Sequence, residues 1–260
     1  MMNNRELFHK DPLSWTLANE GVSSNNDNDF PTLRYELETF VCDGEYRTGL
    51  VKMLQGYLNR LDQEQAGAWV SGFYGSGKSH LVKVLRYVWT DFALPNGSTA
   101  RGVTTLPEEV AELLKELSTR GKQGAGLHAA GGTLKAGKGD IRTRVLGIVF
   151  RSVGLPEDVS IASLMLDLRD DGTLAAIESK IQSFGKDPLT EFSRMYTSKE
   201  FLEAYLDQYP HHQDVKAAAA AVRAQYPPKP GEMSIDGMLT QIRRAISRDG
   251  KLPCTVLVLD

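Results

Sequence analysis

Apolar residues recur at every third or fourth position over much of the chain, and this spacing predicts amphipathic helices. Turns at 185–188 and at Pro210 and a proline-rich break at 226–231 divide the last group of these stretches, because proline cannot continue a helix. The predicted helices lie at about 44–61, 81–88, 108–117 and 140–153, with several more between 155 and about 248.

Two short apolar runs lack the helical spacing and predict strands. Ala68–Ser71 is a brief β-favouring run, and Thr255–Leu259 contains four consecutive aliphatic residues. Continuous apolar runs of this length are typical of parallel strands that are buried on both faces. The chain is therefore predicted to be α/β, with a parallel sheet. Residues 1–39, which include a polar stretch at 23–29, are predicted to lie outside the main domain.

A glycine-rich segment joins the first predicted strand to the helix that follows it. Residues Gly72–Ser79 match the pattern G-x-x-x-x-G-K-[ST] at every fixed position. Glycines let successive backbone N–H groups turn inward around an anion, a lysine supplies a point charge for the β- and γ-phosphates, and a hydroxyl ligates Mg²⁺. The segment therefore predicts a phosphate-binding loop for ATP and Mg²⁺. The predicted nucleotide-binding residues are Gly72, Phe73, Tyr74, Gly75, Ser76, Gly77, Lys78, Ser79 and His80.

An acidic residue follows the second predicted strand. Asp260 stands directly after Thr255–Leu259, at the end of a strand where open α/β sheets bind their ligands. In P-loop NTPases an aspartate at this place, the Walker B residue, holds Mg²⁺. We expect Lys78 and Asp260 to be the catalytic residues of this segment, and Ser79 and Asp260 to be the metal ligands.

A second glycine-rich stretch resembles the loop incompletely. Residues Gly132–Gly139 nearly repeat the pattern, but Gly139 replaces the hydroxyl residue and no clear apolar strand leads into the stretch. It is predicted to be a mobile loop rather than a nucleotide site.

Composition excludes several classes of protein. The 260 residues carry a net charge of −3, which gives no overall basic field for nucleic acid. No apolar run is long enough to cross a bilayer and the N-terminal residues Met1–Glu6 contain no signal-peptide core, so we expect a cytoplasmic location without membrane contact. Cys42 and Cys254 lack metal-ligand spacing and are expected to be buried as small hydrophobic residues. His211 and His212 are expected at an exposed helix end rather than on a metal.

Several strings around the loop resemble the BrxC/PglY family of large P-loop ATPases from BREX (bacteriophage exclusion) defence systems. The resemblance rests on Phe40–Arg47, Trp69–Lys83, Gly126–Leu134 and Phe150–Pro156 and covers nearly the whole chain. It implies an AAA+-like ATPase that acts with a methyltransferase, a phosphatase-like protein and other defence components. It leaves room for self-association, and for DNA contact only within the full complex. By the same analogy Val41 or Tyr46 lines the base pocket.

The resemblance also implies a division of the chain. We expect an N-terminal fragment of a larger protein, because the glutamate that polarises water, the sensor and the arginine finger of such ATPases would follow Asp260. The fragment alone is expected to bind ATP without fast hydrolysis. The expected parts are an extension at 1–39, the first part of a P-loop ATPase core at 40–154, a helical insertion at 155–248 and the Walker B strand at 249–260.

Other functions stay open at this point. One alternative is a nucleotide-gated scaffold protein, in which bound ATP orders assembly without significant hydrolysis. Another is an AAA+ or STAND-type ATPase unrelated to defence. A small-molecule kinase fits the helical insertion and the N-terminal extension less well. A GTPase is disfavoured because no N-K-x-D string is present.

Overall fold

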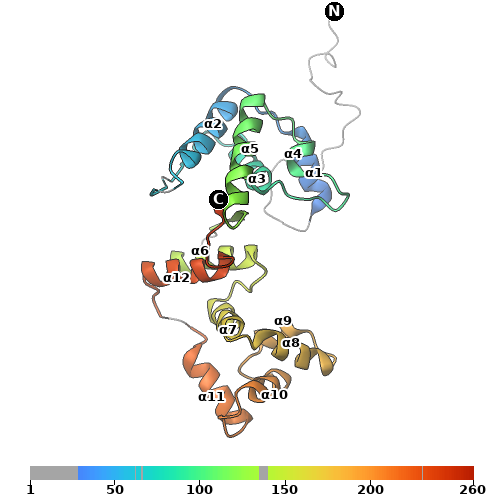
Figure 1. Cartoon of the computed structure of the whole chain (residues 1–260), viewed down its shortest axis with the longest axis vertical. Helices are drawn as coiled ribbons and strands as arrows, with labels where there is room; N and C mark the ends of the chain where they lie inside the picture. Colours follow the sequence, from blue (N-terminus) through green and yellow to red (C-terminus); the bar gives the residue numbers. More distant parts are fainter. Residues whose placement is uncertain (1–28, 62, 66, 135–139, 230) are drawn as a thin grey trace, which may run out of the picture. The chain divides into compact units, whose positions relative to one another are not determined.

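The computed structural model describes residues 29–61, 63–65, 67–134, 140–229 and 231–260 (Figure 1). The chain divides into two compact units, one formed by residues up to Thr133 with Pro253–Asp260 and the other by Leu134–Leu252. The first unit contains α1 (Phe30–Thr39), α2 (Gly44–Leu58), α3 (Lys78–Thr90), α4 (Ala100–Val103), α5 (Glu108–Gln123), β1 (Leu127–Gly132) and β2 (Cys254–Leu259). The second contains α6 (Ile141–Ser152), α7 (Val159–Asp170), α8 (Leu174–Ser183), α9 (Pro188–Ser193), α10 (Lys199–Gln208), α11 (Val215–Gln225) and α12 (Ile235–Ile246).

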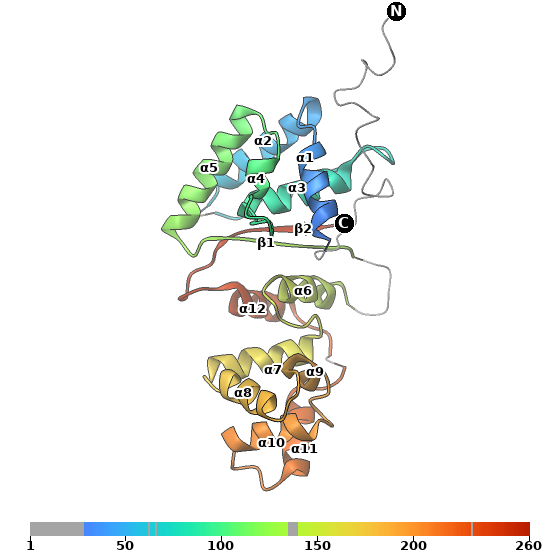
Figure 2. The same ribbon diagram turned by 90° about the vertical axis from the view of Figure 1, so that its right-hand side faces the viewer.

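The described chain is mostly helical and has one parallel sheet of two strands. In the first unit β1 pairs with β2 in the register Leu127↔Cys254 to Gly132↔Leu259, and α3 packs on both strands. Helix α5 also contacts β2, and the views place α1 to α5 on one side of the sheet (Figure 2). The two strands come from segments far apart in the sequence, and their carboxyl ends therefore meet at one edge of the sheet.

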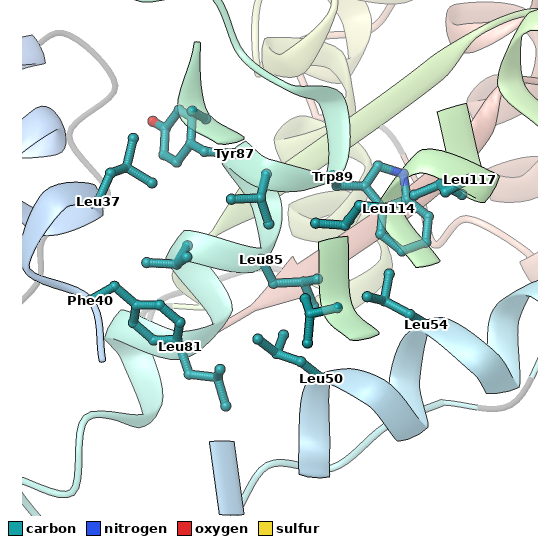
Figure 3. Close-up of a cluster of buried hydrophobic side chains, with 14 of the residues drawn as sticks. Leu37, Phe40, Leu50, Leu54, Leu81, Leu85, Tyr87, Trp89, Leu114 and Leu117 are labelled. Carbon is teal, nitrogen blue, oxygen red and sulfur yellow. The ribbon is translucent and has the colours of Figure 1, made fainter. Parts of the chain in front are cut away.

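The helices of the first unit close over a shared apolar core, shown in Figure 3. Helix α3 is central because it is apolar on most of its circumference, and Tyr87, Val88 and Trp89 are all buried together. The Trp89 indole N–H donates to the Cys254 carbonyl oxygen at 3.0 Å, which ties α3 to the start of β2. Helix α1, which the sequence assigned to an N-terminal extension, adds Leu33 and Leu37 to this core.

One buried ion pair joins α1 to α3. Lys83 Nζ lies 2.5 Å from Glu36 Oε2, and the two side chains are only 3% and 2% exposed. Charges this deeply buried persist in proteins only when they are paired. The pair therefore fixes the position of α1 against the helix that begins at Lys78.

The outer edge of β2, on the side away from β1, is only partly closed. Thr255 donates its backbone N–H to the Tyr57 hydroxyl at 3.1 Å rather than to β1, whereas Cys254 and Asp260 donate theirs to carbonyls of the β1 segment. Because N–H groups alternate along a parallel strand, those of Leu257 and Leu259 point toward the same outer edge as that of Thr255. No strand within the described ranges pairs with that edge.

The second unit has its own core. Helices α7 to α11 bury Phe192, Phe201, Ile177 and Ile181 among other apolar residues, and α6 packs against α12. None of the helices in the described ranges combines the length and the apolar character that crossing a bilayer requires.

Most predicted helices are confirmed, including the proline-rich break after α11. Two expectations about strands were wrong. Ala68–Ser71 forms no strand, because β1 pairs with β2 and no described strand lies beside it, so that Trp69 is 92% exposed. The second wrong expectation was that no strand leads into the glycine stretch at 132–139, because β1 ends at Gly132. The small residues of β1 allow α3 to approach, and a methyl group on Gly131 would lie 2.7 Å from the Arg86 side chain. Residues 135–139 of the second glycine stretch lie outside the described residues. The predicted division into core and insertion stays a prediction.

Candidate functional site

The backbone of the Gly72–Ser79 segment depends on glycine at three positions. Gly75 and Gly77 have φ angles of +79° and +80°, a region that residues with a side chain rarely adopt. A methyl group on Gly72 would lie 2.9 Å from Ser76 Oγ, so the segment also closes on itself where only hydrogen fits. The resulting tight loop leads directly into α3.

The start of α3 offers the features that an anion requires. Gly77 occupies the position before the first helical residue, and no side chain caps the N–H groups of the first turn. Uncapped N–H groups at a helix start, together with the helix dipole, favour a bound anion. Lys78 stands at the same helix end, and its Nζ donates to the Phe73 carbonyl oxygen at 2.8 Å across the loop. The cation and the N–H groups thus belong to one short segment.

Asp260 lies beside this loop. Ser79 Oγ donates to Asp260 Oδ1 at 3.3 Å, a contact between residues 181 positions apart in the sequence. The backbone N–H of Asp260 donates to the Gly132 carbonyl oxygen at 3.0 Å, so the parallel pairing with the β1 segment holds the aspartate in place. The structure therefore brings together the two residues that the sequence assigned to a metal.

A hydroxyl beside a carboxylate is the donor set that suits Mg²⁺. Magnesium prefers oxygen ligands and takes only one or two carboxylates when phosphate supplies the others. Within the described residues, no group of three or more His, Cys, Asp or Glu side chains could hold a metal ion by itself. The pair of Ser79 and Asp260 fits a metal that arrives with a phosphate ligand better than a metal held by protein alone.

Side chains behind the loop hold it against α1 and α2. The Tyr46 hydroxyl lies against Gly77, where an added methyl group would come within 2.5 Å of it. His80 Nε2 lies 2.8 Å from the Glu36 carbonyl oxygen, and the His80 ring meets Phe40 edge-on at 5.4 Å between centroids. Phe40 in turn stacks on Tyr46 at 6.1 Å. The three rings connect the loop to the segment that precedes it.

The aromatic residues inside the loop face solvent. Phe73 and Tyr74 are 92% and 97% exposed, and Val41, which the resemblance placed near a base, is 65% exposed. Their side chains therefore make little contact with the described protein, whereas those of Lys78, Ser79 and His80 are partly buried. Sequence reasoning missed the Glu36–Lys83 pair, whose only signal is a charged residue on the apolar face of each helix.

Electrostatics near the site argue against thiol chemistry. Burial raises the pKa of the Cys42 thiol, although the nearby Arg47 opposes that effect. A thiol with a raised pKa stays protonated at neutral pH, and a protonated thiol is a poor nucleophile and a poor metal ligand. Cys42 is free and partly buried, which is consistent with a packing role.

Comparison with known proteins adds no relative by family or fold: no protein-family model matches the chain, and no solved structure matches it.

Proposed function

We propose that this chain binds ATP with Mg²⁺ at the Gly72–Ser79 loop and forms part of an AAA+-like P-loop ATPase. The observation that carries the proposal is the contact between Ser79 Oγ and Asp260 Oδ1. A chance match of the glycine pattern would not require a carboxylate from the end of a strand 181 residues away to lie beside the hydroxyl of the loop.

Each residue of the site has a distinct part in this proposal. Backbone N–H groups of the loop and of the first turn of α3 bind the phosphates, and Lys78 exchanges its contact with Phe73 for the β- and γ-phosphates. Ser79 and Asp260 hold Mg²⁺, which neutralises charge on the phosphates when it is bound. Tyr46 and His80 keep the loop in shape from behind.

Binding can be tested by titrating the chain with a fluorescent ATP analogue, with and without Mg²⁺. We expect Lys78→Ala to abolish measurable binding and Asp260→Asn to weaken only the binding that depends on Mg²⁺. Lys216→Ala is the matched control, because Lys216 is an exposed residue of α11 in the second unit. Equal binding by the wild type and Lys78→Ala would refute the proposal.

The biological role that we propose is the one that the resemblance implies: ATP-dependent assembly or remodelling of a BREX defence complex. Its support is the set of strings at Phe40–Arg47 and Gly126–Leu134, which lie at the start of α2 and along β1. The test is a pull-down of the BREX methyltransferase and phosphatase-like protein, with ATP present or absent. Capture that depends on ATP and on Lys78 supports the role, and turnover measured in the captured complex distinguishes an ATPase from a nucleotide-gated scaffold.

A further inference from the structure

The outer edge of β2 has an open part that is four residues long, 256–259. Tyr57 closes the edge at its beginning, because the Tyr57 hydroxyl accepts the backbone N–H of Thr255 at 3.1 Å. No strand among the described residues pairs with the rest of the edge. Exposed edges are usually protected by lysine or proline, and residues 256–259 include neither. A further strand is therefore the expected occupant of this edge.

The residues that lead into the glycine loop, 68–71, are tied near both ends of this open edge, and we call them the entry segment. Before the segment, the Gln65 side-chain amide donates to the backbone carbonyl oxygen of Tyr57 at 3.3 Å. After it, the Ser79 hydroxyl donates to Asp260 at 3.3 Å. The chain is thus held at Tyr57, where the open part of the edge begins, and at Asp260, where it ends. The entry segment therefore runs in the same direction as β2, as a parallel strand must.

Side chains of the entry segment and of β2 share one core. Val70 and Val256 are both partly buried against the apolar cluster of the first unit. Because side chains alternate along an extended chain, Trp69 belongs to the opposite face, as Leu257 does on β2. Both of these residues are exposed, Trp69 at 92% and Leu257 at 38%. The entry segment therefore has the alternation that a strand on this edge needs, and its tryptophan would cover the exposed leucine.

The alternation also fixes the register of such a strand. Pairing of Val70 with Val258 places the entry segment opposite the whole open part of the edge. Because each residue of a parallel pair bonds the two neighbours of its partner, Val70 donates its N–H to the Leu257 carbonyl oxygen and accepts the N–H of Leu259 in this register. A pairing two residues nearer the start of β2 is blocked, because Tyr57 already accepts the N–H that it requires.

We propose that the entry segment adds to the outer edge of β2 as a third parallel strand when ATP binds, an inference that rests on the proposed nucleotide site. Ser71, the last residue of the segment, directly precedes Gly72, where the loop closes on Ser76. A strand that is fixed at Ser71 also fixes the start of the loop. A bound phosphate that orders the loop therefore favours the pairing, and the pairing favours the phosphate by the same free energy. Once paired, the entry segment closes the edge to any other strand.

Amide hydrogen exchange of the full chain, followed by NMR, tests the proposal residue by residue. With saturating ATP and Mg²⁺ we expect exchange of the Leu257 and Leu259 N–H groups to slow by about tenfold or more, because they become hydrogen-bonded. The N–H groups of Val256 and Val258 point toward β1 and should not change, which makes them the internal control. Tryptophan emission should also move to shorter wavelength, and Trp69→Phe should remove this shift.

Two substitutions at Val70 separate pairing from packing. Val70→Pro removes the N–H that the pairing uses, and proline is not tolerated at a strand position whose N–H bonds a neighbouring strand. In this variant ATP should no longer slow exchange at Leu257 and Leu259, and binding of the fluorescent ATP analogue should weaken several-fold. Val70→Ala is the matched control, because it also loses contacts with the core but keeps the N–H, and it should retain the slower exchange.

The outcomes keep this inference apart from the proposed function. Binding of the ATP analogue without slower exchange at Leu257 and Leu259 would overturn the strand addition and leave the nucleotide site intact. Exchange that is equally slow with and without ATP would overturn the dependence on nucleotide. Slower exchange that persists in Val70→Pro would overturn the register. Absence of ATP binding would refute the proposed function, and this inference with it.

Discussion

The buried pair of Glu36 and Lys83 gives the sharpest prediction about the first unit. The variant Lys83→Met keeps the length of the side chain and removes its charge, which leaves the Glu36 carboxylate in a place that is 2% exposed. A buried carboxylate that loses its cationic partner keeps the cost of its lost hydration without the ion pair that offset this cost. The variant should therefore lower the free energy of unfolding of the first unit.

The size of the effect follows from burial. Removal of one partner of a buried ion pair costs about 3–5 kcal/mol, a large part of the roughly 5–15 kcal/mol that stabilises a typical domain. The pair of Arg34 and Glu38, also on α1, has a similar distance of 2.6 Å, but its side chains are 45% and 32% exposed. For such surface pairs about 0.2–1 kcal/mol is expected. Arg34→Met is therefore the matched control.

The natural tryptophans provide the assay. The tryptophans of the chain are Trp15, Trp69 and Trp89, and all three precede the second unit, Leu134–Leu252. Trp89 is buried in the core of the first unit and Trp69 is exposed. Tryptophan fluorescence during denaturation in guanidinium chloride thus reports on the first unit alone, and the midpoint and slope give the free energy of unfolding.

Two outcomes test the reasoning separately. A loss below about 1 kcal/mol in Lys83→Met, equal to that of Arg34→Met, would refute the claim that the pair is desolvated. The double variant Glu36→Gln with Lys83→Met removes both charges and should recover most of the stability, because neutral replacement of a buried pair is often tolerated. If the double variant is as unstable as the single one, packing rather than charge explains the loss.

Three further predictions follow from single contacts. Gly77→Ala should abolish binding of the fluorescent ATP analogue and lower the free energy of unfolding by about 1–2 kcal/mol. Gly75 has the same positive φ, but a methyl group added there would meet no atom within 4 Å, so Gly75→Ala should retain more binding. Equal effects of the two variants would mean that Tyr46 does not restrict the loop. Ser198→Ala removes the cap of α10 and a hydrogen bond to the buried Glu191. Denaturation followed by tyrosine fluorescence and circular dichroism should show a loss of about 1–2 kcal/mol in the free energy of unfolding of the second unit. The transition followed by tryptophan fluorescence should not change, and a shift in it would contradict the separation of the units. Burial and the neighbouring Asp167 raise the pKa of Tyr226. The stability that this tyrosine contributes is therefore fully present below the ordinary tyrosine pKa near 10 and is lost as the pH rises from there toward the raised pKa. Denaturation of the second unit at rising pH should show this loss, and Tyr226→Phe should reduce it.

The sequence predicts local structure better than pairing. Helices such as α2 and α5 can be predicted from the spacing of apolar residues, because residues with this spacing lie on one face, and can be buried together, only when the segment is helical. The conformation of Gly75 and Gly77 follows from the glycine pattern for a similar reason. Strand partners are a property of the whole fold, so neither the pairing of β1 with β2 nor the unpaired state of Ala68–Ser71 could be read from short runs.

The residues of the candidate site also differ in whether the sequence predicts them. Lys78, Ser79 and Asp260 are recognisable by residue type and by their place relative to predicted elements. The Tyr46 hydroxyl and the Glu36–Lys83 pair are not, since a tyrosine or a lysine on a helix is more often a surface or packing residue.

The outer edge of β2 has a consequence for handling the chain in solution. Tyr57 closes that edge at Thr255, but no strand among the described residues pairs with it at Leu257 and Leu259, whose side chains are 38% and 42% exposed. An open edge with apolar flanks is a template on which another strand can add, whether from a legitimate partner or from a second copy that stacks edge to edge. Sedimentation at rising concentration should therefore reveal self-association, and Leu257→Lys should suppress it without disturbing α3. The backbone groups of β2 that face away from β1, opposite to the N–H that holds Asp260 beside the β1 segment, are thus expected to decide whether the chain stays monomeric.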